Sequence, residues 1–349
     1  MPAAPSVPLS VLDLAFVGKD ATVRDALDAT VAAARRAEEL GYRRVWYAEH
    51  HNMASIASSA TAVLIAHVAA QTRTIRLGAG GIMLPNHAPL TIAEQFGTLE
   101  TLHPGRIDLG VGRAPGSDRN TMRALRRDDR AAETFPSDVV ELQGYLTGHT
   151  RIPGVHATPG RDTNVPLYIL GSSLFGATLA AALGLPYAFA SHFAPGALRE
   201  AVATYRREFQ PSEQLAEPYV IAGVNVIAAD TDQDAQDQLR VVSRARVVAL
   251  LGGGRRCSDE EADALLASPQ GRYVAEMMRY SAVGDADTVA DYLDAFTAHA
   301  DADELIVVHP SPTLDAKLRS LELLADATGL PPRSERPTRS VPVEPQTAA

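Results

Sequence analysis

The sequence predicts a (β/α)8 TIM barrel, and the order of its apolar segments carries this prediction. Eight short apolar runs typical of buried parallel strands recur along the chain, and segments with apolar residues at helical spacing separate them. Parallel strands joined by a crossover helix form the βαβ unit from which such a barrel is built. A doubly wound open sheet needs a glycine-rich dinucleotide turn after its first strand, and the segment DLAFVGKD does not provide one.

The composition is that of a globular chain that can bury a large core. The 349 residues are 46% hydrophobic and 21% charged, which suits a barrel of about 250 residues with insertions. The net charge of -10 argues against nonspecific nucleic-acid binding, which needs a basic face. A single cysteine, Cys257, leaves neither an internal disulfide framework nor a thiolate metal cluster and indicates a reduced compartment.

The opening segment and the hydropathy of the chain predict a cytoplasmic protein. The segment MPAAPSVPLS has no basic region and no apolar core after it, so no signal peptide is expected. No run approaches the ~18 apolar residues that a membrane span requires. We therefore expect neither a membrane nor a nucleic-acid partner.

Four strands and the helices between them account for the first half of the predicted barrel. The strands are expected over residues 7–16, 43–48, 75–84 and 107–111. Helices are expected from Val23 to a stop at Gly41, and over residues 58–71 and 92–99. The region 119–147 is expected to be helical with a break at Pro136, because proline lacks a backbone donor.

The second half repeats the alternation after an irregular segment. Residues 148–165 are rich in glycine, proline and polar residues and predict an excursion. Strands are then expected over residues 167–170, 188–190, 219–228 and 305–308. Helices are expected over residues 174–183 and 198–209, after the seventh strand through 248, from Asp287 through 299, and over 313–328. We expect a single domain over residues 8–330, a flexible tail over 1–7 and a disordered tail over 331–349.

Residues 251–285, between the seventh and eighth predicted strands, break the alternation. They combine the glycines at 252–254, a charged turn and two short helical pieces. Glycines allow such a segment to hinge, so it could form a lid over the end of the barrel. The alternative is a solvated surface insertion, and the residues alone favour that alternative.

Histidines follow the second predicted strand at its carboxyl end, where barrels carry their chemistry. The strand ends in Glu49, His50 and His51. Neighbouring strand residues face opposite ways and no HxH or HxxxH spacing occurs, so we expect no metal site here. Either histidine could act as a general acid or base, because free imidazole titrates near pH ~6.5. A structural histidine is an equally open alternative.

Residues 171–173, with the sequence Gly-Ser-Ser, lead from the fifth predicted strand into a helix. Backbone N–H groups and hydroxyls at a helix N-terminus suit a phosphate, although N-capping by serine is the commoner role. Arg113 after the fourth strand could be a second phosphate contact or a surface ion pair. Gly80 and Gly81 could hold a strained peptide beneath a flat ring, or form a bulge. The residues alone therefore predict a phosphate-bearing ligand and do not name the reaction.

Long segments of the chain resemble the luciferase-like flavin monooxygenases, the family that contains the bacterial luciferase subunits. The matching segments are AEELGYRRVWYAEHHN, IRLGAGGIMLPNHAPLTIAEQFGTLETLHPGRIDLGVGRAPG and PLYILGSSLFGATLAAALGLPYAFASHF. The closing segments SAVGDADTVADYL and DELIVVHP match as well, so the resemblance runs from about Pro8 to Gly329. It implies an FMN-dependent monooxygenase that uses reduced FMN (FMNH2) and O2 to oxygenate a small organic substrate through a C4a-peroxyflavin.

The resemblance also implies roles for residues by their position. His50 corresponds to the catalytic histidine, and Gly80-Gly81 to a non-prolyl cis peptide beneath the isoalloxazine ring. The residues that it implies for cofactor binding are Gly80, Gly81, Gly112, Arg113, Gly171, Ser172, Ser173, Leu174 and Phe175. Those that it implies for the substrate or the lid are His51, Met83, His192, Gly252 and Gly253, and residues 251–285 fall at the family's mobile loop. Gly112 and Gly171 stand where light-emitting subunits carry a cysteine and an acidic residue, so no bioluminescence is expected.

The same resemblance implies protein partners for the chain. Three alternative functions also stay open. A separate NAD(P)H:flavin reductase would supply the reduced FMN. A homodimer is also implied, because members of the family commonly form dimers. The rivals are a deazaflavin-dependent dehydrogenase on the same barrel, a non-catalytic flavin-binding protein, and an unrelated phosphate-ligand barrel such as an aldolase or isomerase. In the last class the phosphate site usually follows strands seven and eight, whereas the anion signals here follow strands four and five.

Overall fold

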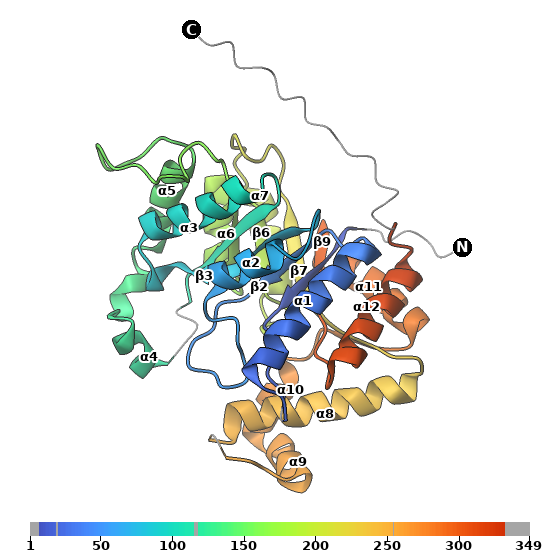
Figure 1. Cartoon of the computed structure of the whole chain (residues 1–349). Coiled ribbons are helices and arrows are strands. Elements are labelled where there is room, and N and C mark those ends of the chain that lie inside the picture. Colours follow the sequence, from blue (N-terminus) through green and yellow to red (C-terminus); the bar gives the residue numbers. More distant parts are fainter. Residues whose placement is uncertain (1–6, 19, 115–117, 254, 332–349) are drawn as a thin grey trace.

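The computed structural model describes residues 7–18, 20–114, 118–253 and 255–331 of the chain. Within these residues, eight parallel strands close into a barrel and helices cover its outside (Figure 1). The predicted fold class is therefore confirmed. The tails expected over residues 1–7 and 331–349 lie outside the described residues, apart from Val7 and Pro331. Within the described part of the chain, no helix has the length and apolar character needed to cross a bilayer.

The barrel strands run in the order β1, β2, β3, β4, β5, β6, β7 and β9, and β9 closes the ring by pairing with β1. They are β1 (Leu9–Asp13), β2 (Arg44–Tyr47), β3 (Arg76–Met83), β4 (Ile107–Gly112), β5 (Leu167–Gly171), β6 (Tyr187–Phe189), β7 (Val220–Ala228) and β9 (Glu304–Val308). The first strand shows the largest disagreement with its predicted bounds. Ala15 has a φ of 49°, which interrupts the extended chain. Phe16 instead forms an isolated antiparallel bridge with Ile56.

Helices connect the strands and pack on the outer face of the barrel. They are α1 (Val23–Leu40), α2 (Thr61–Ala69), α3 (Pro89–Leu102), α4 (Arg119–Ala124), α5 (Phe135–Leu146), α6 (Leu174–Leu183), α7 (Leu198–Glu208), α8 (Asp232–Leu251), α9 (Asp259–Ala267), α10 (Pro269–Glu276), α11 (Ala286–Ala300) and α12 (Leu314–Thr328). Their ends follow ordinary capping chemistry. In α1, Thr22 and Asp25 form a capping box, and Gly41 ends the helix with a φ of 90°.

The predicted helical region 119–147 divides differently from the prediction. A short 3-10 turn, η2 (Asp129–Ala132), separates α4 from α5, so the break comes before Pro136. Pro136 lies in the first turn of α5. A missing N–H costs no helical hydrogen bond there, so the proline opens this helix rather than breaking it.

The interpretation of residues 251–285 needs a correction. The two short helical pieces are present as α9 and α10, but an extra strand, β8 (Ser281–Gly284), follows them. It pairs in parallel with the last part of β7, from Asn225 with Ser281 to Ala228 with Gly284. β7 is nine residues long and β6 only three, so β7 extends beyond its neighbour and leaves an edge for β8 to cover. The next helix, which was expected to start at Asp287, begins at Ala286 and is capped by Asp285, whose side chain accepts from the Thr288 N–H.

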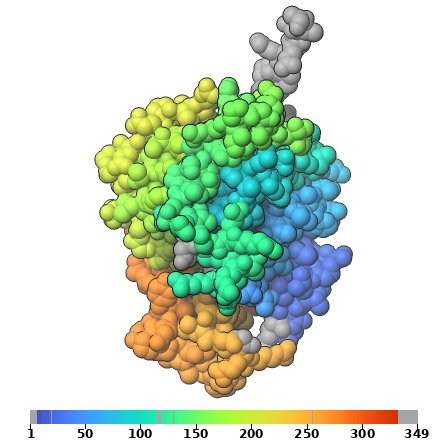
Figure 2. Space-filling view, turned by 90° about the vertical axis from the view of Figure 1, so that its left-hand side faces the viewer, coloured from blue at the N-terminus to red at the C-terminus, as the bar shows by residue number. Residues whose placement is uncertain are grey.

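The carboxyl part of β7 therefore leads into a layer made of α8, α9, α10 and β8. In Figure 1 this layer lies across one end of the barrel. Figure 2 shows its orange surface as the lower part of the molecule, below the green surface of the region around α4 and α5. Within this layer, α9, α10 and β8 belong to residues 251–285, for which the sequence left a lid or a surface insertion open.

The opposite, amino-terminal end of the barrel is filled by a buried ion network. Arg44 opens β2 and pairs with Asp108 at 2.8 Å and with Glu304, the first residue of β9, at 2.9 Å. All three side chains are at most 1% exposed. Above them, Trp46 and Tyr168 pack edge to face with ring centroids 4.9 Å apart. These contacts stabilise the amino-terminal end of the barrel. In barrels of this kind the active site lies at the other end, where the carboxyl ends of the strands meet.

Candidate active site

A buried carboxylate organises the end of β2. Glu49 follows that strand, and its backbone N–H donates to the Gly81 carbonyl at 3.2 Å. Its carboxylate accepts from the Met83 N–H at 3.0 Å and from Nε2 of His51 and His87 at 2.7 and 2.9 Å. Burial alone would raise the pKa of Glu49, but hydrogen bonds and the His87 charge bring the pKa below its ordinary value. The carboxylate is therefore held ionised between two imidazoles.

His50 takes no part in this cluster and carries a free ring nitrogen. Among the described residues, its buried Nδ1 has no hydrogen-bond partner. Burial lowers the pKa of His50, although a backbone hydrogen bond with Ala48 and the Glu49 charge oppose that effect. The ring is therefore neutral near pH 7 and able to exchange a proton.

His192, at the end of β6, lies within electrostatic reach of His50. Burial first, and then the charges of Arg246 and His50, lower the pKa of His192 to about 3. Asn225 donates to the His192 carbonyl at 2.7 Å. A Cβ on Gly223 would lie 2.4 Å from Nδ1 of His192, so only glycine at this position of β7 admits the ring. The two imidazoles face the same end of the barrel from β2 and β6.

The β3 strand is distorted at Gly80 and Gly81. Their peptide is cis, as the resemblance implied, and the β3–β4 register shifts at the same place, which is the bulge offered as the alternative. A Cβ on Gly80 would lie 2.8 Å from Leu12 Cδ1 and 2.9 Å from Trp46 Cβ. A Cβ on Gly81 would lie 2.7 Å from the Gly110 carbonyl oxygen. Close packing of the barrel wall therefore explains both glycines.

The expected phosphate residues meet where β4 and β5 end. The Arg113 guanidinium lies over the Phe175 ring, 3.9 Å from its centroid. Ser173 occupies the N-cap of α6 but its side chain makes no capping hydrogen bond, while the Tyr187 hydroxyl donates to its carbonyl at 3.0 Å. Among the described residues, no carboxylate pairs with Arg113, so the surface ion pair offered as the alternative is not formed there. The structure thus brings together a cation and a helix N-terminus whose N–H groups no side chain caps.

The structure places the predicted site residues in three groups. Those at the ends of β4 and β5 are Gly112, Arg113, Gly171, Ser172, Ser173, Leu174 and Phe175. Of the residues assigned to substrate or lid, His51 and Met83 bind Glu49, and His192 lies near His50. Gly252 and Gly253 lie at the end of α8, where Gly253 has a φ of 62°. The third glycine of that hinge, Gly254, lies outside the described residues.

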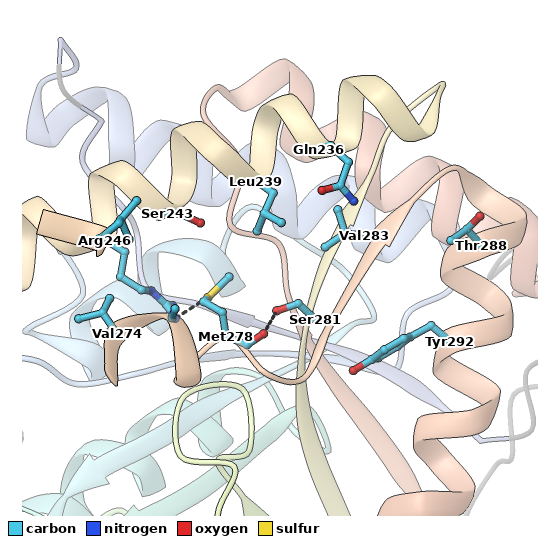
Figure 3. Close-up of a pocket in the computed structure, with 12 residues that line it drawn as sticks. Gln236, Leu239, Ser243, Arg246, Val274, Met278, Ser281, Val283, Thr288 and Tyr292 are labelled. Atoms are coloured by element: carbon cyan, nitrogen blue, oxygen red, sulfur yellow. Dashed lines mark hydrogen bonds between the residues drawn. The ribbon is translucent and has the colours of Figure 1, made fainter. Parts of the chain in front are cut away.

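Two features of this end of the barrel were not predicted. Glu49 and His87 stand 38 residues apart, yet both are needed for the carboxylate cluster. A cavity of about 470 Å³ lies between α8, α9, α10, β8 and α11 (Figure 3). Its walls come from elements that follow one another between residues 236 and 292, and only their packing brings the lining residues together. Within the described ranges, no group of three or more His, Cys, Asp or Glu side chains is arranged to hold a metal ion.

Comparisons with known proteins identify relatives over most of the chain. The family described as luciferase-like monooxygenase matches residues 7–302. A "Luciferase-like monooxygenase" of Escherichia coli (strain K12) is 46% identical over 325 residues, which cover 92% of this chain and 97% of that protein. The "N-acetyl-S-alkylcysteine monooxygenase" of Bacillus subtilis (strain 168) is 34% identical over 331 residues, which cover 91% and 97%. The crystal structure of apo-MsnO8 superposes with a TM-score of 0.83 at 36% identity and covers 94% of this chain and 100% of that one.

Proposed function

Because the chain belongs to the luciferase-like monooxygenase family, we propose that it is an FMN-dependent monooxygenase that oxygenates a small organic substrate with reduced FMN and O2. Proteins of this family use flavins, either FMN or F420. The observation that carries the proposal is the pairing of Arg113 with the uncapped N-terminus of α6. A phosphate at that place would meet a guanidinium and backbone N–H groups together.

The residues at the end of the barrel fit FMN. Arg113, with Ser172, Ser173 and the N–H groups of Leu174 and Phe175, would hold the phosphate. Arg113 has no carboxylate partner among the described residues, so a phosphate would supply its counter-ion. When bound, reduced FMN supplies the electrons that activate O2.

The side chains then divide the remaining work. His50 acts as the general acid or base, because burial keeps this imidazole neutral and leaves its Nδ1 without a partner among the described residues. Glu49 fixes the rings of His51 and His87 beside it and so orders that wall of the site. Within residues 251–285, α9 and α10 act as the lid that excludes water, and the position of their layer across one end of the barrel supports this role.

A relative suggests which substrates to assay first. The Bacillus subtilis protein with 34% identity is named for N-acetyl-S-alkylcysteines, which are thioether acids. We propose compounds of this class as the first substrates to be tried with the present protein.

Titration with three flavins tests the choice of cofactor. The protein is titrated with FMN, riboflavin and F420 while flavin fluorescence is followed. We expect saturable binding of FMN, and binding of riboflavin that is at least about tenfold weaker, since riboflavin lacks the phosphate. Tighter binding of F420 than of FMN would instead indicate a deazaflavin-dependent dehydrogenase. Binding of none of the three would overturn the proposal.

A further inference from the structure

One face of α8 lines the cavity at the end of the barrel with side chains that are polar except for Leu239. Gln236, Leu239, Ser243 and Arg246 recur at helical spacing and point into the cavity (Figure 3). A helix that packs against protein ordinarily presents an apolar stripe there. The cavity volume, about 470 Å³, lies within the range of about 300–1,000 Å³ that small-molecule sites occupy.

Arg246 is the one cation among the residues that line this cavity, and it has no counter-ion in the described chain. Its Nη1 donates to the Met278 sulfur at 2.6 Å, and a thioether is a weak acceptor. No carboxylate of the described residues forms a salt bridge with it. Burial lowers the pKa of Arg246, which reflects the cost of a charge without a partner.

A neighbouring arginine on the same helix, Arg244, forms ion pairs within the protein and can be compared with Arg246. Arg244, two residues earlier, pairs with Asp259 at 2.7 Å and with Asp263 at 2.6 Å, both on α9. These bridges tie α8 to α9 at the surface. The fold thus provides carboxylates for Arg244 and, among the described residues, none for Arg246, which leaves the Arg246 guanidinium available to an anionic ligand.

The other walls of the cavity define the rest of that ligand. Leu239, Val274 and Val283 give them an apolar character. Arg246 also lies within electrostatic reach of His192, which in turn is within reach of His50. A ligand whose anionic group lay at Arg246 would therefore have its apolar body in the cavity and the histidines nearby.

We propose that Arg246 binds the carboxylate of the substrate, and that the substrate is a small organic acid with an apolar body. This inference rests on the proposed function and adds the substrate class to it. The cofactor phosphate is assigned to a different arginine, Arg113 at the end of β4. Guanidinium and carboxylate match in a bidentate geometry, so the contact would fix orientation as well as charge.

Calorimetric titration with matched acids and amides tests this inference. The probes are N-acetyl-S-methylcysteine, phenylacetate and hexanoate, each beside its uncharged amide. We expect at least one acid to bind, at least about tenfold more tightly than its amide. Arg246→Gln should remove that preference, and Arg246→Lys should restore part of it. Arg240→Gln is the matched control, since Arg240 lies on the same helix with its side chain 57% exposed.

The outcomes separate this inference from the cofactor assignment, because the titrations are run with and without FMN. Acid binding that disappears in Arg246→Gln supports the inference even if FMN itself does not bind. If no acid binds, or if acids bind Arg246→Gln as well as the unaltered protein, the inference is wrong. It is also overturned if Arg246→Gln weakens FMN but not riboflavin, because Arg246 would then hold the cofactor phosphate.

Discussion

His50 is partly buried, neutral and free at Nδ1, which are the properties of a side chain that exchanges a proton during turnover. His50→Ala should slow turnover by about 10²-fold or more, since general acid–base catalysis typically contributes that much. FMN affinity should change little, because the phosphate residues lie at the ends of other strands. Steady-state kinetics and flavin titration on the same preparation measure both effects.

A surface histidine provides the control for this variant. His156 is exposed, so His156→Ala should leave turnover unchanged. Added imidazole should recover part of the activity of His50→Ala. Turnover equal to that of the unaltered protein would remove His50 from the mechanism.

Gly80 illustrates a residue whose identity is set by its neighbours in the barrel wall. A methyl group there would approach Leu12 and Trp46 to within 2.9 Å, so Gly80→Ala should destabilise the fold by about 1–3 kcal/mol through overpacking. A methyl group on Gly196 would have no heavy atom within 4 Å apart from the adjoining residues of the chain. Gly196→Ala should therefore be close to neutral, and urea unfolding compares the two variants. Equal free energies of unfolding would show that the packing account of Gly80 is mistaken.

At the scale of elements, the proposed phosphate site combines the start of α6 with the end of β4, where Arg113 lies over the Phe175 ring. Arg113→Gln should weaken FMN binding by about tenfold or more, the scale of a charge-assisted contact to phosphate. Riboflavin binding should be nearly unaffected because riboflavin has no phosphate. Arg130→Gln serves as the control, since that side chain is 84% exposed on a different element. A parallel loss for FMN and riboflavin would place the effect of Arg113 on the ring and not on the phosphate.

The elements also show what local sequence patterns can and cannot predict. Helix α6 and strands β4 and β5 were predicted because apolar periodicity and turn residues are local signals. β8 was missed because Ser281–Gly284 is too short to show a period, and it is a strand only because β7 extends past β6. The same holds for the Glu49–His87 contact, which depends on the folding of β2 and β3 side by side.

For the whole molecule, the eightfold alternation was enough to predict the barrel, whereas the cavity could not be predicted. The cavity is lined by residues between Gln236 and Tyr292 from five elements, and no spacing in the sequence brings them together. In the sequence, nothing distinguishes Arg246 from the other arginines. Only the packing of α8 shows that its neighbour Arg244 has carboxylate partners and that Arg246 has none within the described ranges.

The stability of the whole fold should fall in acid because of a buried histidine. His309 is 3% exposed, and burial first, then the Lys317 charge, lower its pKa from 6.5 to about 3. A pKa depressed in the folded state means that only the unfolded chain takes up the proton between those values. The contribution of His309 is therefore present above pH 6.5 and is lost as pH falls toward about 3, at up to about 1.4 kcal/mol per pH unit.

The variant His309→Gln isolates this contribution. Its free energy of unfolding should fall less steeply below pH ~6.5 than that of the unaltered protein. Denaturant titrations at several pH values give the two slopes. His156→Gln, which changes an exposed histidine, should keep the original slope. If the free energy of unfolding has the same pH dependence in His309→Gln and in the unaltered protein, His309 does not cause the loss of stability in acid.

The most direct test of the central claim is anaerobic binding of reduced FMN, followed by a pulse of O2 and rapid-mixing spectroscopy. If the protein is an FMN-dependent monooxygenase, it binds reduced FMN, O2 oxidises the bound flavin, and the absorbance of oxidised flavin returns with kinetics distinct from those of free reduced FMN. Substrate turnover should then depend on that O2. A protein that binds no reduced FMN, or whose bound reduced FMN is indifferent to O2, would contradict the account.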